Sequence, residues 1–137
     1  MFHDARRANG HHAEPDVLGV YHFYCGEAAE KAKEEPRESI LRYLAAAAAA
    51  NQEAAYSEQY SAYKKPREGF KMMDYDKYLY PHRLIFGDPD QCAARRAQIR
   101  ATGITNIGLI GNFGGLERGK ILTSLDRFAK YVMPRFA

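Results

Sequence analysis

The stretch Gly108-Leu-Ile-Gly-Asn-Phe-Gly-Gly115 decides the fold, together with the strand that leads into it and the helix that follows it. Residues 104–110 form a nearly unbroken apolar run, which predicts a parallel strand covered on both faces. Asn112 and the two glycines after Phe113 predict a turn where the backbone can approach a ligand, because no Cβ blocks the approach. The chain is therefore expected to pass from a buried strand into a glycine-rich loop.

A helix is expected after this loop, since apolar residues recur three and four positions apart and form one stripe. Pro134 is expected to end the helix. The stripe consists of Ile121, Leu122, Leu125, Phe128, Ala129 and Val132.

A second unit of the same kind lies upstream. Residues 83–86 are β-prone, and Asp88-Pro-Asp-Gln91 matches a capping box with proline at the first helical position. This helix should run to about Thr102, with Gly103 as the left-handed residue after it. The C-terminal half is thus predicted to be strand, helix, strand, loop and helix, as in a parallel sheet.

A third strand is predicted at residues 17–25, which are β-branched and aromatic. Alternation places Val20, His22 and Tyr24 on one face of it. A histidine in the middle of a strand has two interpretations: a buried imidazole satisfied by a neighbouring polar group, or a group that lines a ligand cavity.

Helices are expected at residues 27–35 and 39–55, separated by Pro36, and the second has the strongest helix propensity in the chain. Residues 2–9, followed by Gly10, resemble the end of a helix. A chain that begins in this way is expected to lack a preceding part.

Residues 56–81 form a long tyrosine-rich segment with little periodicity. Such segments in compact domains are often functional lids or insertions. The other interpretation is that the tyrosines only cover apolar surface. Aromatic residues among lysines also occur in proteins that bind single-stranded nucleic acid, but no fold signature supports that partner here.

Composition excludes several classes. The 137 residues suffice for one domain, 46% are apolar and 27% charged, and the net charge of +3 is not concentrated in one segment, so nucleic acid is not an expected partner. No apolar run is long enough to span a membrane and no secretory signal opens the chain. Cys25 and Cys92 lack metal-ligand spacing, and the adjacent pair His11 and His12 does not predict a metal site either. The expectation is a soluble cytoplasmic protein without metal and with reduced thiols.

Three stretches carry a resemblance to a known family. Ile85-Phe-Gly-Asp-Pro-Asp-Gln91, Gly103-Ile-Thr-Asn-Ile-Gly-Leu-Ile-Gly-Asn-Phe-Gly-Gly115 and Ser124-Leu-Asp-Arg-Phe-Ala-Lys-Tyr-Val-Met-Pro134 resemble the end of luciferase-like, flavin-dependent monooxygenases. Residues 17–32 are similar to an earlier strand and helix of the same family.

The resemblance implies an α/β fold, the C-terminal part of a (β/α)₈ TIM barrel, with about three parallel strands, flanking helices and the tyrosine-rich insertion. Residues 1–137 would then be one partial barrel domain. The family uses reduced FMN and molecular oxygen, and a separate flavin reductase often supplies the reduced flavin. In barrels of this kind the active site lies at the carboxyl ends of the strands.

The resemblance also implies site residues. His22 matches a histidine that many members carry inside this strand, and it is the expected catalytic residue. The expected cofactor-binding residues are Tyr24, Gly111, Asn112, Phe113, Gly114 and Gly115. An arginine that members similar to alkanesulfonate monooxygenases place two residues before the histidine is Val20 here, so a sulfonate substrate is not favoured.

A closed barrel needs eight strands and about 250 residues, and this sequence predicts three strands. Open sheet edges and an apolar inner face should drive association with further copies or with a complementary chain. We therefore expect a monooxygenase that acts on a small organic substrate when another chain completes its barrel. The other hypothesis is a non-catalytic, self-associating or flavin-binding remnant. A nucleotide-binding loop at residues 111–115 is disfavoured, because the sequence lacks both GxGxxG and the P-loop ending.

Overall fold

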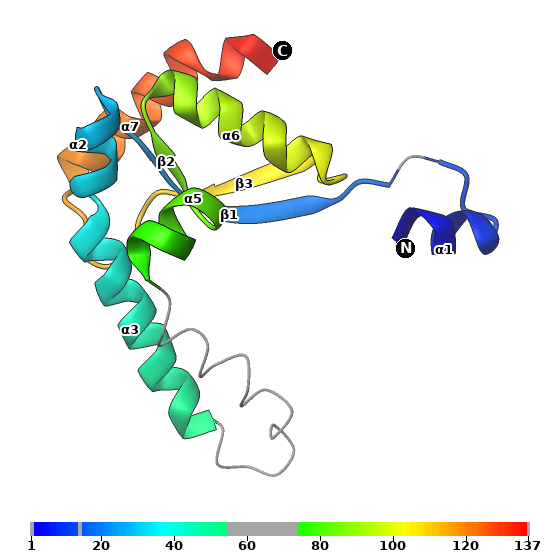
Figure 1. Cartoon of the computed structure of the whole chain (residues 1–137), viewed down its shortest axis with the longest axis horizontal. Coiled ribbons are helices and arrows are strands. Elements are labelled where there is room, and N and C mark those ends of the chain that lie inside the picture. The colour runs from blue at the N-terminus through cyan, green and yellow to red at the C-terminus, as the bar shows by residue number, and fades with distance from the viewer. Residues whose placement is uncertain (1, 14, 55–73, 137) are drawn as a thin grey trace.

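The computed structural model describes residues 2–13, 15–54 and 74–136. Three parallel strands form one sheet, and most helices gather around it, while α1 (Phe2–Ala8) lies apart from them (Figure 1). The remaining elements in chain order are β1 (Leu18–Cys25), α2 (Ala29–Glu34), α3 (Arg37–Ala54), the π-helical turn η2 (Tyr75–Leu79), α5 (Tyr80–His82), β2 (Ile85–Gly87), α6 (Pro89–Ala101), β3 (Asn106–Ile110), α7 (Arg118–Tyr131) and the 3₁₀ turn η3 (Met133–Phe136). The three predicted strands are confirmed to within two residues at each end.

The strand β1 is the centre of the sheet. Its carboxyl end pairs with β2, where Tyr24 is the partner of Phe86, and the rest of it pairs with β3, where His22 is the partner of Ile110. The strand order is therefore β2-β1-β3. The expected mixed α/β fold with three parallel strands and flanking helices is confirmed, and it is consistent with part of an α/β barrel. The order differs from that of three successive barrel strands, because β3 pairs with β1 and not with β2.

One face of the sheet is covered by α6 and α7. The buried side chains of this face include Phe23 and Cys25 from β1 and Ile85 from β2, together with Cys92 and Ile99 from α6. Phe23 also meets the ring of Phe128 from α7, with ring centroids 4.8 Å apart. This cluster is the core that fixes α6 and α7 against the strands.

Among the described residues, the opposite face is covered only toward the carboxyl ends of the strands. There Tyr24, Phe86 and Phe113 pack against Ile40 of α3 and other side chains of the second cluster. Toward the start of β1 the cover is absent among the described residues, and Leu18 and Val20 are 64% and 56% exposed. The alternation of side chains between the two faces of β1, predicted from the sequence, is confirmed. On one face, however, the described residues leave the first half of this central strand exposed.

The prediction that residues 104–110 are buried on both faces is wrong. The side chains of β3 are exposed or half-buried throughout, because β3 is an edge strand of the sheet and shares the uncovered face of β1. The apolar side chains of β3 therefore form a surface that remains accessible to a partner.

The expected helix signals upstream are confirmed. Asp88 caps α6, its carboxylate accepts a hydrogen bond from the Gln91 amide at 2.9 Å, and the Gln91 side chain returns the bond to the Asp88 amide at 3.1 Å. Gly103 and Gly10 adopt left-handed conformations, with φ of 94° and 79°. Pro36 separates α2 from α3 as expected. The last long helix ends at Tyr131, and Pro134 lies in the 3₁₀ turn that follows.

Most of the tyrosine-rich segment lies outside the described residues, and only its end is seen. Tyr75 and Leu79 of η2 are buried in the same cluster as Tyr24 and Phe86. The Tyr75 hydroxyl donates a hydrogen bond of 2.6 Å to the Lys33 carbonyl. At this end of the segment Tyr75 therefore covers apolar surface, whereas Tyr78 is exposed, and both interpretations of the remaining segment concern residues outside the described part. In the described part of the chain, no helix has the length and apolar character of a transmembrane span.

Candidate functional site

The candidate site lies where β1 and β3 end, on the partly covered face of the sheet. His22 and Tyr24 both project to this face from β1. The loop that follows β3 lies beside them, since His22 is the register partner of Ile110, the last residue of β3. The structure thus brings the predicted catalytic histidine and the predicted glycine-rich loop to one place.

His22 is surrounded by aromatic rings. Its imidazole meets the ring of Tyr43 from α3 at a centroid distance of 4.7 Å and the ring of Phe113 from the loop at 5.4 Å, both edge to face. The Nε2 atom is buried and has no hydrogen-bond partner among the described residues. Such an unpaired buried nitrogen is uncommon and needs an explanation.

Burial lowers the pKa of His22 below its ordinary value, because the charged imidazolium is poorly solvated in this apolar setting. The imidazole is therefore neutral at physiological pH. A neutral imidazole has one nitrogen that donates and one that accepts, so it can take up or give a single proton to a ligand next to it.

Tyr24 is not open to a ligand. Its side chain is 4% exposed and its hydroxyl donates a short hydrogen bond to the Glu35 carboxylate, at the end of α2. Burial raises the pKa of Tyr24, and the hydrogen bond to Glu35 and the negative charge of Glu35 raise it further. The residue expected to bind the cofactor instead fastens the β1 strand to the helix that follows it.

Phe113 also belongs to the core. It is 2% exposed, and its ring is stacked on that of Phe86 with centroids 5.7 Å apart. The side chain therefore forms the floor of the site beneath His22. The neighbouring Asn112 is exposed and is the polar side chain of the loop that a ligand can reach directly.

The loop glycines have different roles. Gly114 has a φ of 54°, and a Cβ placed there would lie 1.7 Å from the Ser39 carbonyl oxygen. The close approach predicted from the sequence is therefore made to α3 and not to a ligand. Gly115, with a φ of 74°, has nothing within 4 Å of a Cβ, and a Cβ at Gly111 would touch only the Ile121 side chain at 3.7 Å. These two positions leave backbone accessible at the rim of the site.

Sequence analysis missed two residues of the site. Tyr43 lies 21 positions after His22 in the middle of α3, and its contact with the imidazole depends on how α3 crosses the strands. Glu35 is one of several acidic residues around Pro36, and no local pattern distinguishes it. The sequence offered one indication that Tyr43 contacts the site: it is an aromatic residue in an alanine-rich helix, just before the run of small residues that begins at Ala45.

The site combines a neutral histidine, aromatic walls and a polar rim. The aromatic rings beside His22 favour a flat, uncharged ring system over a charged ligand. Among the described residues, His22 and Tyr24 bring titratable groups to this site, and the Tyr24 hydroxyl is already bonded to Glu35. Proton transfer and hydrogen bonding are what these residues can supply. No cluster of three or more metal-ligating side chains occurs in the described part of the chain.

Comparisons with known proteins identify a structural relative. No family model matches the sequence, and no curated protein matches it. The monooxygenase RslO1 from Streptomyces bottropensis has a similar structure, with a TM-score of 0.69 and 22% identity over 99% of this chain. At this identity the similarity concerns the fold. The match covers 36% of the RslO1 chain, so the present chain spans about one third of that protein.

Proposed function

We propose that this chain is the C-terminal portion of a luciferase-like, FMN-dependent monooxygenase barrel, which acts on a small organic substrate when another chain completes the barrel. The resemblance of the three C-terminal stretches supports the family, and the similarity to a monooxygenase supports the fold. The partly uncovered sheet supports the requirement for a second chain.

One observation carries the proposal. The Nε2 atom of His22 is buried and lacks a partner among the described residues, and the imidazole contacts two aromatic rings in the second half of a parallel strand. A structural histidine would be expected to have both nitrogens satisfied. The free nitrogen is explained if it bonds a ligand that enters from the uncovered side.

The residues present fit a flavin ring only in part. His22 is suited to bond a polar atom of the ring system, Tyr43 and Phe113 are suited to exclude water, and Asn112 and the backbone at Gly115 are suited to bind its polar edge. Tyr24 and Gly114, by contrast, are engaged with Glu35 and Ser39. Contacts to the flavin phosphate are proposed to come from the completing chain.

The cofactor supplies the redox chemistry: reduced FMN provides the electrons with which one atom of molecular oxygen enters the substrate. The protein residues have other tasks. His22, being neutral, holds or moves one proton at its free nitrogen. The aromatic rings around it keep water away from that nitrogen. The reduced flavin is proposed to come from a separate reductase.

The test is a titration of oxidised and reduced FMN with the purified chain, with its mass followed by light scattering. We expect micromolar binding by an associated form of the chain and loss of binding when dilution dissociates it. Replacement of His22 by Phe should weaken the binding, whereas the same change at the exposed His82 of α5 should not. An associated chain that binds no FMN at millimolar concentration contradicts the proposal.

The second candidate function is that of a non-catalytic module that self-associates. The exposure of Leu18 and Val20 favours it, since association buries them whether or not a flavin is present. The same titration separates the two functions, because the second predicts association without binding.

A further inference from the structure

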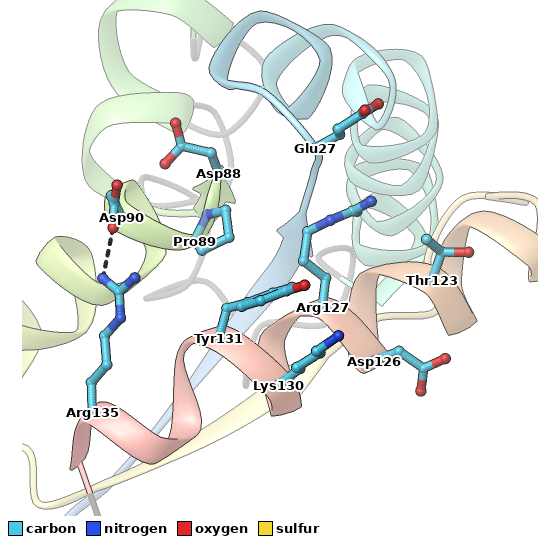
Figure 2. A pocket seen from close by; sticks show the side chains of 10 residues that line it. All are labelled: Glu27, Asp88, Pro89, Asp90, Thr123, Asp126, Arg127, Lys130, Tyr131 and Arg135. Atoms are coloured by element: carbon cyan, nitrogen blue, oxygen red, sulfur yellow. Dashed lines mark hydrogen bonds and ion pairs between the residues drawn. The ribbon is translucent and has the colours of Figure 1, made fainter.

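A pocket outside the functional site lies on the side of the sheet that α6 and α7 cover, away from His22. It has a volume of about 690 Å³ and is bounded by the turn after β1, the first turn of α6 and one side of α7 (Figure 2). The functional site described above does not use it. Most of the hydrogen-bond donors that line the pocket lie on α7, and most of the carboxylates lie on the other walls. This distribution indicates a ligand.

The wall formed by α7 carries hydrogen-bond donors. Thr123, Arg127, Lys130 and Tyr131 line the pocket and follow one another at helical spacing, so they form one stripe along the helix. Figure 2 shows Arg127 and Tyr131 among the side chains that line this pocket. Neither Arg127 nor Lys130 has a carboxylate within ion-pair distance among the described residues.

The carboxylates of the other walls are already engaged. Glu27 forms an ion pair of 2.9 Å with Lys31, and Asp90 forms one of 2.7 Å with Arg135. Asp88 is the capping residue of α6 and accepts the Gln91 amide. The groups without such a partner are therefore mainly the donors on α7. Asp126 stands at the edge, since it also lines the neighbouring groove over β3.

Arg127 is held in place for a ligand. It is half-buried, and its Nη1 atom donates a hydrogen bond of 3.0 Å to the Cys25 carbonyl, the last residue of β1. This bond uses one of the five donors of the guanidinium, so the others remain for a second partner. A half-buried guanidinium commonly pairs with an oxyanion, and no described residue places a carboxylate within ion-pair distance of Arg127.

We propose that this pocket binds the oxyanion of a small molecule, specifically a phosphate group, between Arg127, Lys130 and Tyr131. A phosphate presents several acceptor oxygens to converging donors, whereas a carboxylate presents two in one plane. The site is independent of flavin and of the proposed monooxygenase function, since it lies on the opposite face of the sheet and shares no residue with the His22 site.

The experiment is calorimetric titration of the full chain with inorganic phosphate, with sodium chloride of equal ionic strength and acetate as separate arms. We expect saturable phosphate binding, at least about tenfold tighter than acetate binding, and no saturable heat from chloride. Lys130→Gln should weaken phosphate binding about tenfold, and Arg127→Gln should abolish it.

Arg118→Gln is the matched control, because Arg118 is an exposed cation on the same helix and does not line the pocket. It should leave the phosphate affinity unchanged. Arg127→Gln also removes the hydrogen bond to the Cys25 carbonyl, so this variant could fold poorly. In that case the Lys130→Gln variant still decides the test. Equal affinities of the Lys130→Gln and Arg118→Gln variants would overturn the proposal, as would acetate binding that equals or exceeds phosphate binding.

Discussion

Gly114 and Ser39 approach so closely that a Cβ on Gly114 would lie 1.7 Å from the Ser39 carbonyl oxygen. The loop after β3 is thereby pressed against the start of α3. This contact places the Phe113 ring against Phe86 and His22, and α3 itself supplies Tyr43, whose ring also contacts the imidazole. The aromatic surroundings of His22 therefore depend on glycine at position 114, because a side chain there would clash with α3.

Gly114→Ala should destabilise the fold strongly. The substitution adds a clash with backbone and a side chain at a φ of 54°, which together should cost about 3 kcal/mol or more. Gly115→Ala is the control, since it has a φ of 74° but free space, and it should cost only about 1 kcal/mol. Urea unfolding of both variants measures the difference. Equal losses of stability would contradict the packing role.

Stability should fall in alkaline solution because of Tyr24. Its pKa is raised in the folded state, so the protonated hydroxyl stabilises the fold below the unfolded value of about 10. That contribution is lost as the pH rises above this value, since the unfolded chain releases the proton more easily. Urea unfolding between neutral pH and pH 11 should show a steeper decline for the parent chain than for Tyr24→Phe.

Tyr75 has a raised pKa as well, through burial, and so contributes in the same pH range. The Tyr24→Phe variant should therefore keep part of the decline, and the variant that also carries Tyr75→Phe should lose more of it. A parent chain whose stability does not change up to pH 11 contradicts both assignments.

Local structure was largely predictable from the sequence because it depends on neighbours in the chain. The capping box of Asp88 and Gln91, the left-handed Gly103 and the break at Pro36 involve residues within a few positions of one another. The alternation along β1 likewise follows from backbone geometry. These features do not require knowledge of which elements meet.

The strand order and the true partners of the site residues were not predictable in this way. Three apolar strands do not specify which one is central, and β1 took that place by pairing with both others. Tyr24 was expected to face a ligand, yet a carboxylate 11 positions away bonds its hydroxyl. Gly114 was expected to admit a ligand, yet α3 fills the space. In each case the deciding partner lies on another element.

Stability should fall in mildly acidic solution because of His22. Burial lowers its folded-state pKa below 6.5, so the unfolded chain binds a proton that the folded chain resists. As the pH falls below about 6.5, this difference favours the unfolded state. His22→Phe keeps an aromatic ring between Tyr43 and Phe113 and removes the titration, so it should lose less stability between pH 7 and pH 5.

The direct measurement for this prediction is the chemical shift of the His22 ring protons as a function of pH. The midpoint should lie below 6.5, and it should move upward in Tyr43→Ala, because removing the tyrosine ring lets water reach the imidazole. A midpoint at or above 6.5 in the parent chain contradicts the assigned burial effect.

The exposed side chains at the start of β1 should control association. Leu18 and Val20 are 64% and 56% exposed on a central strand, and burying each against a partner gains roughly 1–2 kcal/mol. Val20→Lys should therefore shift the mass measured by light scattering toward that of the single chain, 15.5 kDa. The stability of the fold should change little, since the side chain makes no part of either core cluster.

Leu122→Lys is the matched control for this variant. Leu122 is 50% exposed on α7, at the covered side of the sheet, so its substitution adds the same charge without touching the uncovered face. A barrel completed through the β1 and β3 face requires that only Val20→Lys dissociates the assembly. If Leu122→Lys dissociates it equally, or if the mass of Val20→Lys is unchanged, the association uses another surface and the uncovered face is not where the second chain binds.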